Sequence, residues 1–389
     1  MLGLAFRIAE RMGIHNESAN VRCTVLEAEM RRRLWWSLIL FDTRICEMSS
    51  LNSTMLGPTW DCKIPLNVND FELRPEMKTA PTVQGQSTEA VFAVVRSELG
   101  DFVRHSNFHL DFTSPALKAL VKNARRDANT VGGELDNIEK MVEDKYFKYC
   151  NPDNPLHFMT IWTARGYLAK ARLLECYSRS MGSTDQQTEA RGDIAATHAL
   201  NMLECDTKLL SSPLIKRYQW MVDFYFPFPA YVHVVQNLKK RSVGEHAEKA
   251  WKIMDDNYAA RFLTMEQHPD TFFKLFARVV LQAWDACEAT FGQSNKTAEP
   301  PTIVLNVRNR LSRMDVNAQD SNTELPKDIA SMNIDDYMSV PMDFGHDLTT
   351  YAMEGQGFPD TTGPATMGFD ANQWNWNTAD WNTSHGTGW

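Results

Sequence analysis

Cysteines at metal-ligand spacing are missing from this sequence. The seven cysteines lie 16 to 88 positions apart, with no C-x2-C pair and no cysteine/histidine cluster. These residues therefore supply no zinc module. Their odd number, and the lack of an apolar signal segment behind Met1, predict a reducing intracellular compartment. No apolar run reaches 18 residues, so the sequence predicts no contact with a membrane.

Catalytic motifs are missing as well. The sequence has no G-x-S-x-G, no G-x-x-x-x-G-K-[ST], no G-x-G-x-x-G and no H-E-x-x-H. Asp255-Asp256-Asn257 is the nearest approach to the acid cluster with which an all-α enzyme holds magnesium, but it lacks a further acid one turn on. His105 and His109 are four positions apart and have no third ligand nearby in sequence. We therefore predict a protein that is not an enzyme and that holds neither cofactor nor metal.

Positive charge is scarce in the C-terminal part of the chain, residues 321–389, but not in the rest. The sequence has 40 Lys+Arg against 49 Asp+Glu, a formal charge of -9. Residues 321–389 contain ten acids and one base, 1 - 10 = -9, so the first 320 residues are neutral. Such a body is not held on nucleic acid by bulk charge. The basic runs Arg31–Arg33 and Lys239–Arg241 are short for that role, and since Arg31–Arg33 precedes two tryptophans we expect it to pack or pair internally.

Helical periodicity runs through the body, so the predicted fold class is all-α: a multi-helix domain with a long irregular loop. Glycines and prolines place that loop at about 50–87. One expected helix begins at a Thr24/Glu27 capping box and ends near Ser49. Asn154-Pro155 is typical of an N-cap and first helical residue. Helices are expected at 1–12, 24–49, 88–104, 115–128, 134–149, 155–180, 187–211, 214–241 with a break at Pro227, 245–257, 270–291 and 301–312.

The helix over 24–49 carries an apolar stripe that we expect to face the core. It should be long and largely buried. The stripe consists of Leu26, Met30, Leu34, Leu38, Phe41 and Ile45.

The C-terminal part has a different composition. Only eight of residues 321–389 are Ile, Leu, Val or Phe, which is too few to offset the entropy of ordering, so we predict disorder. The segment nevertheless holds four tryptophans among acidic and polar residues, a composition of transcriptional activation segments. The alternative is a tail without a partner. The predicted organisation is an all-α body over 1–312 and a disordered acidic, aromatic tail over 313–389. The four tryptophans are Trp374, Trp376, Trp381 and Trp389.

Several separated motifs resemble the fungal-specific transcription factor domain, which is the middle homology region of fungal zinc binuclear-cluster regulators. The resemblance covers about residues 1–290 and begins with LAFRIA to MGIH at 4–15 and EMRRRLWW at 29–36. It continues with WDCKIPLNVND at 60–70, EDKY to CNPDNPLH at 143–157, and KRYQW at 216–220. The motif residues, to which we assign a structural role, are Arg31, Arg32, Arg33, Trp35, Trp36, Asp42, Pro65, Asp70, Pro155, Leu156 and His157.

The resemblance implies a nuclear transcription regulator of RNA polymerase II genes, whose domain restrains or modulates an activator. It implies a coactivator or the transcription machinery as partner of the tail, and a small-molecule effector or partner protein for the body. In this family DNA is read by an N-terminal six-cysteine, two-zinc cluster, so zinc and DNA would be bound only through a module absent from this chain. We therefore expect an N-terminally truncated domain or a cluster-less relative. Two alternatives stay open: a cluster-less interaction scaffold and an all-α enzyme.

Overall fold

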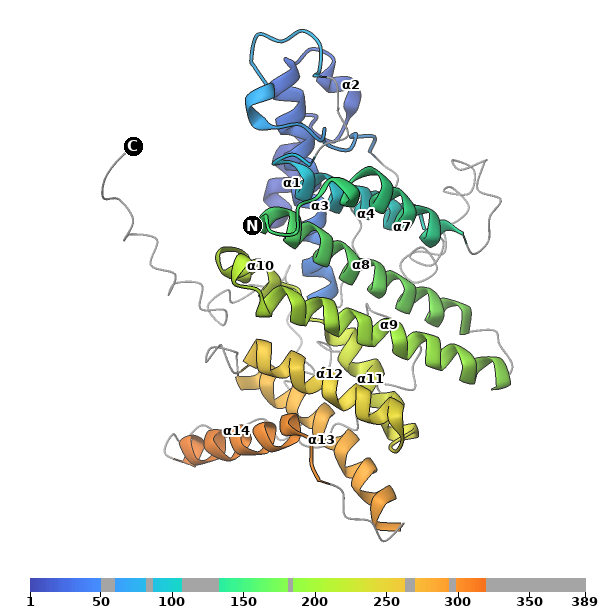
Figure 1. The fold of residues 1–389 in the computed structure, drawn as a ribbon. Coiled ribbons are helices and arrows are strands. Elements are labelled where there is room, and N and C mark those ends of the chain that lie inside the picture. Colours follow the sequence, from blue (N-terminus) through green and yellow to red (C-terminus); the bar gives the residue numbers. More distant parts are fainter. Residues whose placement is uncertain are drawn as a thin grey trace, which may run out of the picture.

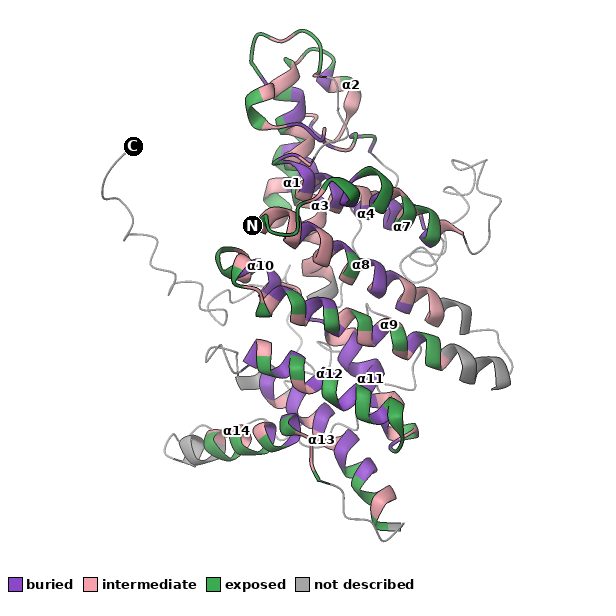
Figure 2. Ribbon diagram, viewed as in Figure 1, coloured by how far each residue is buried: buried purple, intermediate pink, exposed green. Residues whose placement is uncertain are grey.

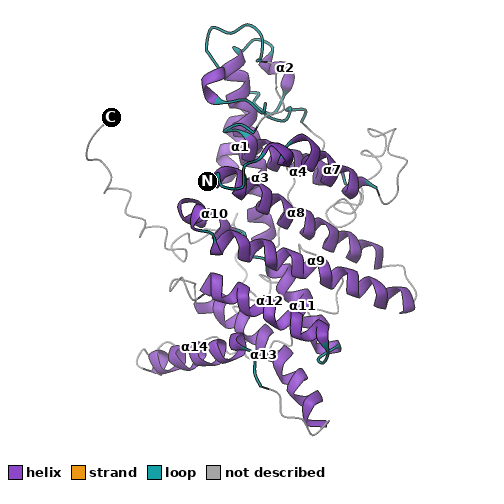
Figure 3. Cartoon of the chain, in the orientation of Figure 1, coloured by secondary structure: helices purple, strands orange, loops and turns teal. Residues whose placement is uncertain are grey.

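The computed structural model describes residues 1–49, 60–81, 87–106, 133–180, 185–262, 270–293 and 299–319. Within these ranges the secondary structure is helical, and no strand occurs (Figure 3). The predicted all-α class is confirmed. The helix expected at 115–128 and the tail from 320 onward lie outside the described residues.

The N-terminal helices pack around a tryptophan core at one end of the molecule (Figure 1). This end comprises α1 (Leu2–Arg11), α2 (Glu17–Asn20), α3 (Val25–Ser49), the 3-10 turn η1 (Asp70–Glu72) and α4 (Val91–His105). Gly13, at φ 68°, ends the first helix in a conformation that favours glycine. Gly100 lets α4 approach α3, because a Cβ there would lie 3.0 Å from Leu40 and 3.3 Å from Trp36.

The expected buried face of α3 is wrong. Met30, Leu34 and Phe41 are 51%, 49% and 45% exposed, whereas Trp35 and Trp36 are each 1% exposed. The buried stripe lies on the opposite side of the helix and also contains Ala28, Glu29 and Ile39. Trp35 and Trp36 are the largest apolar side chains of α3, and the side that carries them is buried because Phe6, Ile14 and Trp60 pack against it.

Two long helices lie side by side in the middle of the molecule (Figure 1). They are α8 (Pro155–Ser180) and α9 (Asp185–Ser211), and α7 (Glu134–Lys145) with η3 (Phe147–Tyr149) precedes them. The predicted cap of α8 is confirmed: Asn154 Oδ1 accepts the backbone N–H groups of Leu156 at 2.9 Å and His157 at 3.3 Å, with Pro155 as first residue.

The remaining helices enclose the largest apolar core. Its buried residues are most visible on α11 and α13, whereas the outer helices expose one side (Figure 2). Pro227 precedes α11, as the sequence predicts, and the last helix continues beyond the expected end at 312. The elements are η4 (Pro213–Tyr218), α10 (Gln219–Phe224), α11 (Phe228–Lys240), α12 (Glu245–Phe262), α13 (Asp270–Gln293) and α14 (Thr302–Gln319).

Candidate functional site

The side chains of Arg31–Arg33 hold the end of α1, the helix α2 and the segment after residue 60 against α3. Arg31 donates to the Met12 carbonyl at 3.3 Å, which anchors the end of α1. Arg32 pairs with Glu17, whose carboxylate also accepts the Lys63 backbone N–H at 3.2 Å. Arg31 and Arg32 therefore form hydrogen bonds to other parts of this chain, which confirms the prediction of internal pairing.

Arg33 bridges two carboxylates of very different burial. Its Nε lies 3.0 Å from Glu29 and its Nη1 lies 2.6 Å from Asp70. Glu29 is 0% exposed and also accepts the Leu66 backbone N–H at 3.0 and 3.1 Å. Burial raises the pKa of Glu29, and the Leu66 and Arg33 hydrogen bonds only partly offset that rise. Glu29 is thus a buried charge that holds the segment after residue 60 against α3.

The same segment is attached to α4 on its other side. The Thr88 hydroxyl donates to the Asn67 side chain at 2.6 Å, and both residues are buried. Asn69 accepts the Glu89 backbone N–H at 3.2 Å. Arg104 donates to the Trp60 carbonyl at 3.0 Å and lies 3.5 Å above the Trp60 ring. Residues 60–73 therefore form a strap between two helices rather than a free loop.

Three indoles make the apolar centre of this region. The Trp60 ring contacts Trp35 and Trp36 edge-on, with centroids 5.6 and 5.2 Å apart. Trp36 Nε1 donates to the Lys63 carbonyl at 2.9 Å. The two adjacent tryptophans of the sequence motif thus meet the strap directly.

The other predicted motif residues are spread over three places. Asp42 is half-buried and accepts a weak hydrogen bond from the Cys46 thiol at 3.9 Å. Pro65 is buried in the strap, and Asp70 begins the 3-10 turn η1 within it. Pro155, Leu156 and His157 begin α8, where His157 Nδ1 accepts the Asn151 backbone N–H at 3.0 Å. The structure joins Arg31–Arg33, Trp35, Trp36, Pro65 and Asp70 around the strap, and separates them from Asp42 and the start of α8.

A second cluster, the arginine hub, consists of Arg44, Arg96 and Arg261. These residues come from α3, α4 and α12 and converge on the turn at Phe224–Phe226. Arg44 donates to the Phe224 carbonyl at 2.8 Å and lies 5.2 Å from the Tyr225 ring centre. Arg96 donates to the Tyr225 hydroxyl at 2.5 Å. Cations beside the free carbonyls at the end of α10 are favoured by the helix dipole.

Arg261 is the most buried member of the hub. Its side chain is 0% exposed and binds Asp206 of α9 through Nε at 2.6 Å and Nη2 at 2.5 Å. Its Nη2 also lies 3.3 Å from the Val222 carbonyl and 3.4 Å from the Tyr225 carbonyl. Because one guanidinium joins three elements, removing it would loosen α9, α10 and α12 from one another.

Asp223 is a further acid beside this ion pair. Burial raises its pKa to about 6, with Arg261 lowering and Asp206 raising it. Asn257 completes the network by donating to Asp206 at 2.8 Å and accepting the Tyr231 hydroxyl at 2.7 Å. The network is a polar link between helices within an apolar core.

The magnesium-like motif Asp255-Asp256-Asn257 does not converge on one point. Asp255 accepts the Ile303 backbone N–H at 2.5 Å and so holds the first turn of α14. Asp256 pairs with Lys252 at 3.0 Å, and Asn257 belongs to the buried network. His105 donates from Nδ1 to the Asp101 carbonyl at 2.8 Å, and His109 lies outside the described residues. Among the described residues no group of three His, Cys, Asp or Glu side chains has metal-binding geometry.

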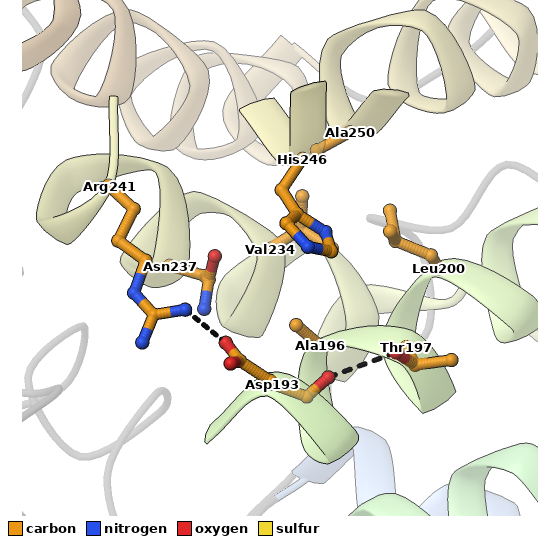
Figure 4. A pocket seen from close by; sticks show the side chains of 9 residues that line it. All are labelled: Asp193, Ala196, Thr197, Leu200, Val234, Asn237, Arg241, His246 and Ala250. Carbon is orange, nitrogen blue, oxygen red and sulfur yellow. Dashed lines mark hydrogen bonds and ion pairs between the residues drawn. The ribbon is translucent and has the colours of Figure 1, made fainter. Parts of the chain in front are cut away.

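A shallow hollow opens between α9, α11 and α12 (Figure 4). Asp193 pairs with Arg241 at its rim, and His246 and Asn237 point toward it (Figure 4). It has room for roughly one water molecule, which is far less than a small-molecule effector needs.

Sequence reasoning did not identify the hub. Arg261 interrupts an otherwise apolar helical stretch, which is a signal that the sequence offers, whereas Arg44 and Asp206 stand among other polar residues. Such a residue is expected to have a buried partner, but the partner's identity depends on how the helices pack.

Comparison with known proteins shows that the N-terminal part of the chain, which includes Arg31–Arg33, the strap and part of the arginine hub, is similar to a known family. The family described as fungal specific transcription factor domain matches residues 1–156. Arg31–Arg33, the strap and two of the three hub arginines lie inside the matched residues, and Arg261 lies outside them. Among the described residues no helix is long and apolar enough to cross a membrane.

Individual proteins are similar to this chain over nearly its whole length. The transcriptional regulator AacuB of Aspergillus aculeatus is 47% identical over 99% of this chain, which covers 54% of that protein. The transcriptional regulator nsrM of Aspergillus novofumigatus is 44% identical, with 100% and 54% covered. The aurofusarin cluster transcription factor aurR2 of Gibberella zeae is 26% identical, with 73% and 42% covered. The chain thus spans about half the length of AacuB and of nsrM, and no solved structure matches it.

Proposed function

We propose that this chain is the helical regulatory part of a nuclear transcription regulator that controls genes read by RNA polymerase II. The observation that carries the proposal is the 47% identity to a transcriptional regulator over 99% of the chain. The proposed action is regulation rather than catalysis, with no cofactor in this part of the protein. Two of the relatives are named as cluster transcription factors, which supports a set of clustered biosynthetic genes as the target.

Specific DNA binding is assigned to a zinc cluster that is not in this chain. Both its neutral first 320 residues and the charge of -9 over 321–389 oppose attachment to phosphates by bulk charge. Residues 321–389 are the proposed contact for a coactivator or the transcription machinery, because the segment is acidic and its four tryptophans stand among Asn, Asp, Thr and Gly residues. A small-molecule effector or partner protein is the proposed regulator of the body.

The arginine hub supports a regulatory role for the body. It joins helices of the matched family domain, through Arg44 and Arg96, to the C-terminal helices, through Arg261. A partner that moves one side of the hub must break or shift hydrogen bonds to the other side. Such a shared element is the physical requirement for coupling between distant surfaces.

A tethering experiment tests the proposed function. The full chain is fused to an unrelated DNA-binding module in a fungal reporter strain and compared with the module alone at equal protein level. We expect a clear change in reporter output, upward for an activator and downward for a repressor. Equal outputs would contradict the proposal.

Two matched variants separate the contribution of the tail in the same assay. One replaces Trp374, Trp376, Trp381 and Trp389 with alanine, and its control replaces Asn372, Asn375 and Asn377 with alanine. We expect only the tryptophan variant to lose output, since an indole buried in a partner groove contributes on the order of 2 kcal/mol. Equal loss in both variants would remove the special role of the tryptophans.

A further inference from the structure

Trp220 is the one exposed tryptophan among the seven that the structure describes, at 66% exposure. It stands at the start of α10, while Met221 and Val222 beside it are buried. A single exposed apolar side chain is ordinary on a protein surface. What surrounds Trp220 therefore decides whether it marks an interaction surface.

Exposed cations lie close to this indole in the sequence. Lys216 and Arg217, in the last turn of η4, lie four and three positions before Trp220, and all three residues are exposed. Lys208 adds a third exposed cation in the last turn of α9, which contacts both η4 and α10. None of the three cations has a described carboxylate within 4.0 Å, including Glu204, one turn before Lys208 on α9. We call Lys208, Lys216, Arg217 and Trp220 the basic tryptophan patch.

A segment of opposite character follows the described part of the chain. Residues 334–348, IDDYMSVPMDFGHDL, contain four aspartates and no lysine or arginine. Apolar residues alternate with the acids, a composition that suits a binding segment and resists packing into a core. Its four acids are opposite in charge to the three cations of the patch, and aromatic side chains such as its tyrosine and phenylalanine pack favourably on an indole.

The chain is long enough to bring the two together. Residue 334 lies 15 positions after Gln319, the end of α14, so the intervening chain spans up to roughly 50 Å when extended. The η4–α10 turn and α14 project toward the same side of the molecule (Figure 1). A tethered segment meets its site at an effective concentration of the order of millimolar, which favours it over a free competitor.

We propose that residues 334–348 of this chain bind the basic tryptophan patch. Aspartates of the segment pair with Lys208, Lys216 and Arg217, while an aromatic or methionine side chain covers Trp220. The binding is intramolecular and weakens as salt rises, since exposed charge pairs are screened. This inference does not depend on the proposed function, and a negative result would leave the tethering experiment unaffected.

Photo-crosslinking in the full chain tests the proposal. A benzophenone amino acid replaces Trp220, and a control protein carries it at Val243, which is also exposed at 56%. After irradiation, peptide mapping of the monomer band should place crosslinks from position 220 in residues 334–348, and few from position 243. Crosslinks from 220 only to another copy, only to other parts of residues 320–389, or to none, would each overturn the proposal.

A charge-reversal pair checks the electrostatic part. K216E/R217E should lower the crosslink yield from position 220 roughly tenfold at low salt, because two attractive contacts become repulsive. K249E/K252E, which reverses two exposed charges on α12, should leave it unchanged. Equal yields in the two variants would contradict the pairing of acids with the patch.

Discussion

Arg261→Leu is the substitution that probes the arginine hub most directly. The change removes a side chain that is 0% exposed and leaves the Asp206 carboxylate, 8% exposed, with the hydrogen bond from Asn257 at 2.8 Å. An uncompensated buried charge of this kind costs about 3–5 kcal/mol. The Val222 and Tyr225 carbonyls lose a donor as well, so we expect the upper part of that range.

The double variant D206L/R261L separates charge pairing from loss of volume. Asn257 keeps its hydrogen bonds to the Leu203 carbonyl at 3.2 Å and Thr207 at 3.0 Å when Asp206 is removed. Replacing both partners of a buried pair is often neutral, so we expect the double variant to lie within about 2 kcal/mol of the parent.

Urea unfolding followed by circular dichroism measures both effects. For each variant we fit the free energy of unfolding and its slope against urea concentration. A slope that differs from that of the parent indicates a changed unfolded state, so free energies are compared only between variants with equal slopes. The account predicts a large loss for Arg261→Leu and substantial recovery in the double variant. If the free energy of unfolding of Arg261→Leu lay within about 1 kcal/mol of that of the parent, the reasoning would be refuted, because loss of a buried, hydrogen-bonded guanidinium is expected to cost more than that.

Three further predictions concern the other clusters. Trp35→Ala and Trp36→Ala should each lower the free energy of unfolding by about 3–5 kcal/mol in urea titrations, since both rings are 1% exposed. Glu29→Ala should destabilise far more than Asp70→Ala, which costs under about 1 kcal/mol, because the two carboxylates share Arg33 but are 0% and 68% exposed. Asp223→Asn should stabilise the protein by about 1 kcal/mol at pH 7.5, an advantage that disappears near pH 4.

The sign of the Asp223 effect follows from its raised pKa. In the folded protein the pKa is about 6, above the ordinary 3.8, so between these values the folded state binds more protons than the unfolded state. The free energy of unfolding then falls as pH rises through this window, and above it the charged carboxylate is a constant cost. Asparagine removes that cost. If Asp223→Asn changed the free energy of unfolding equally at pH 7.5 and at pH 4, the raised pKa of Asp223 would be contradicted.

Local signals in the sequence predicted much of the fold. Asn154-Pro155 predicts the start of α8 because a cap depends only on neighbouring residues. Pro227 predicts the break before α11 for the same reason. The N-terminal cap of α3 also holds, since Thr24 Oγ1 accepts the Glu27 backbone N–H at 3.2 Å.

Features that depend on tertiary packing could not be predicted. The apolar stripe through Met30 and Leu34 has helical spacing, yet the opposite side of α3 is buried because α1, α4 and the strap cover its tryptophans. Arg261 and Asp206 are 55 positions apart, so no local pattern joins them. Spacing shows that a helix has an apolar face, but the size of the side chains and the neighbouring elements decide which face is buried.

Chromatin immunoprecipitation tests the central claim most directly. The native gene is tagged at the 3′ end in its own fungus, and DNA bound to the product is sequenced together with an untagged control. The account predicts enrichment at promoters of protein-coding genes, and deletion of the gene should change the transcripts from those promoters. A tagged product that is expressed but enriched at no promoter would contradict the assignment to transcriptional regulation.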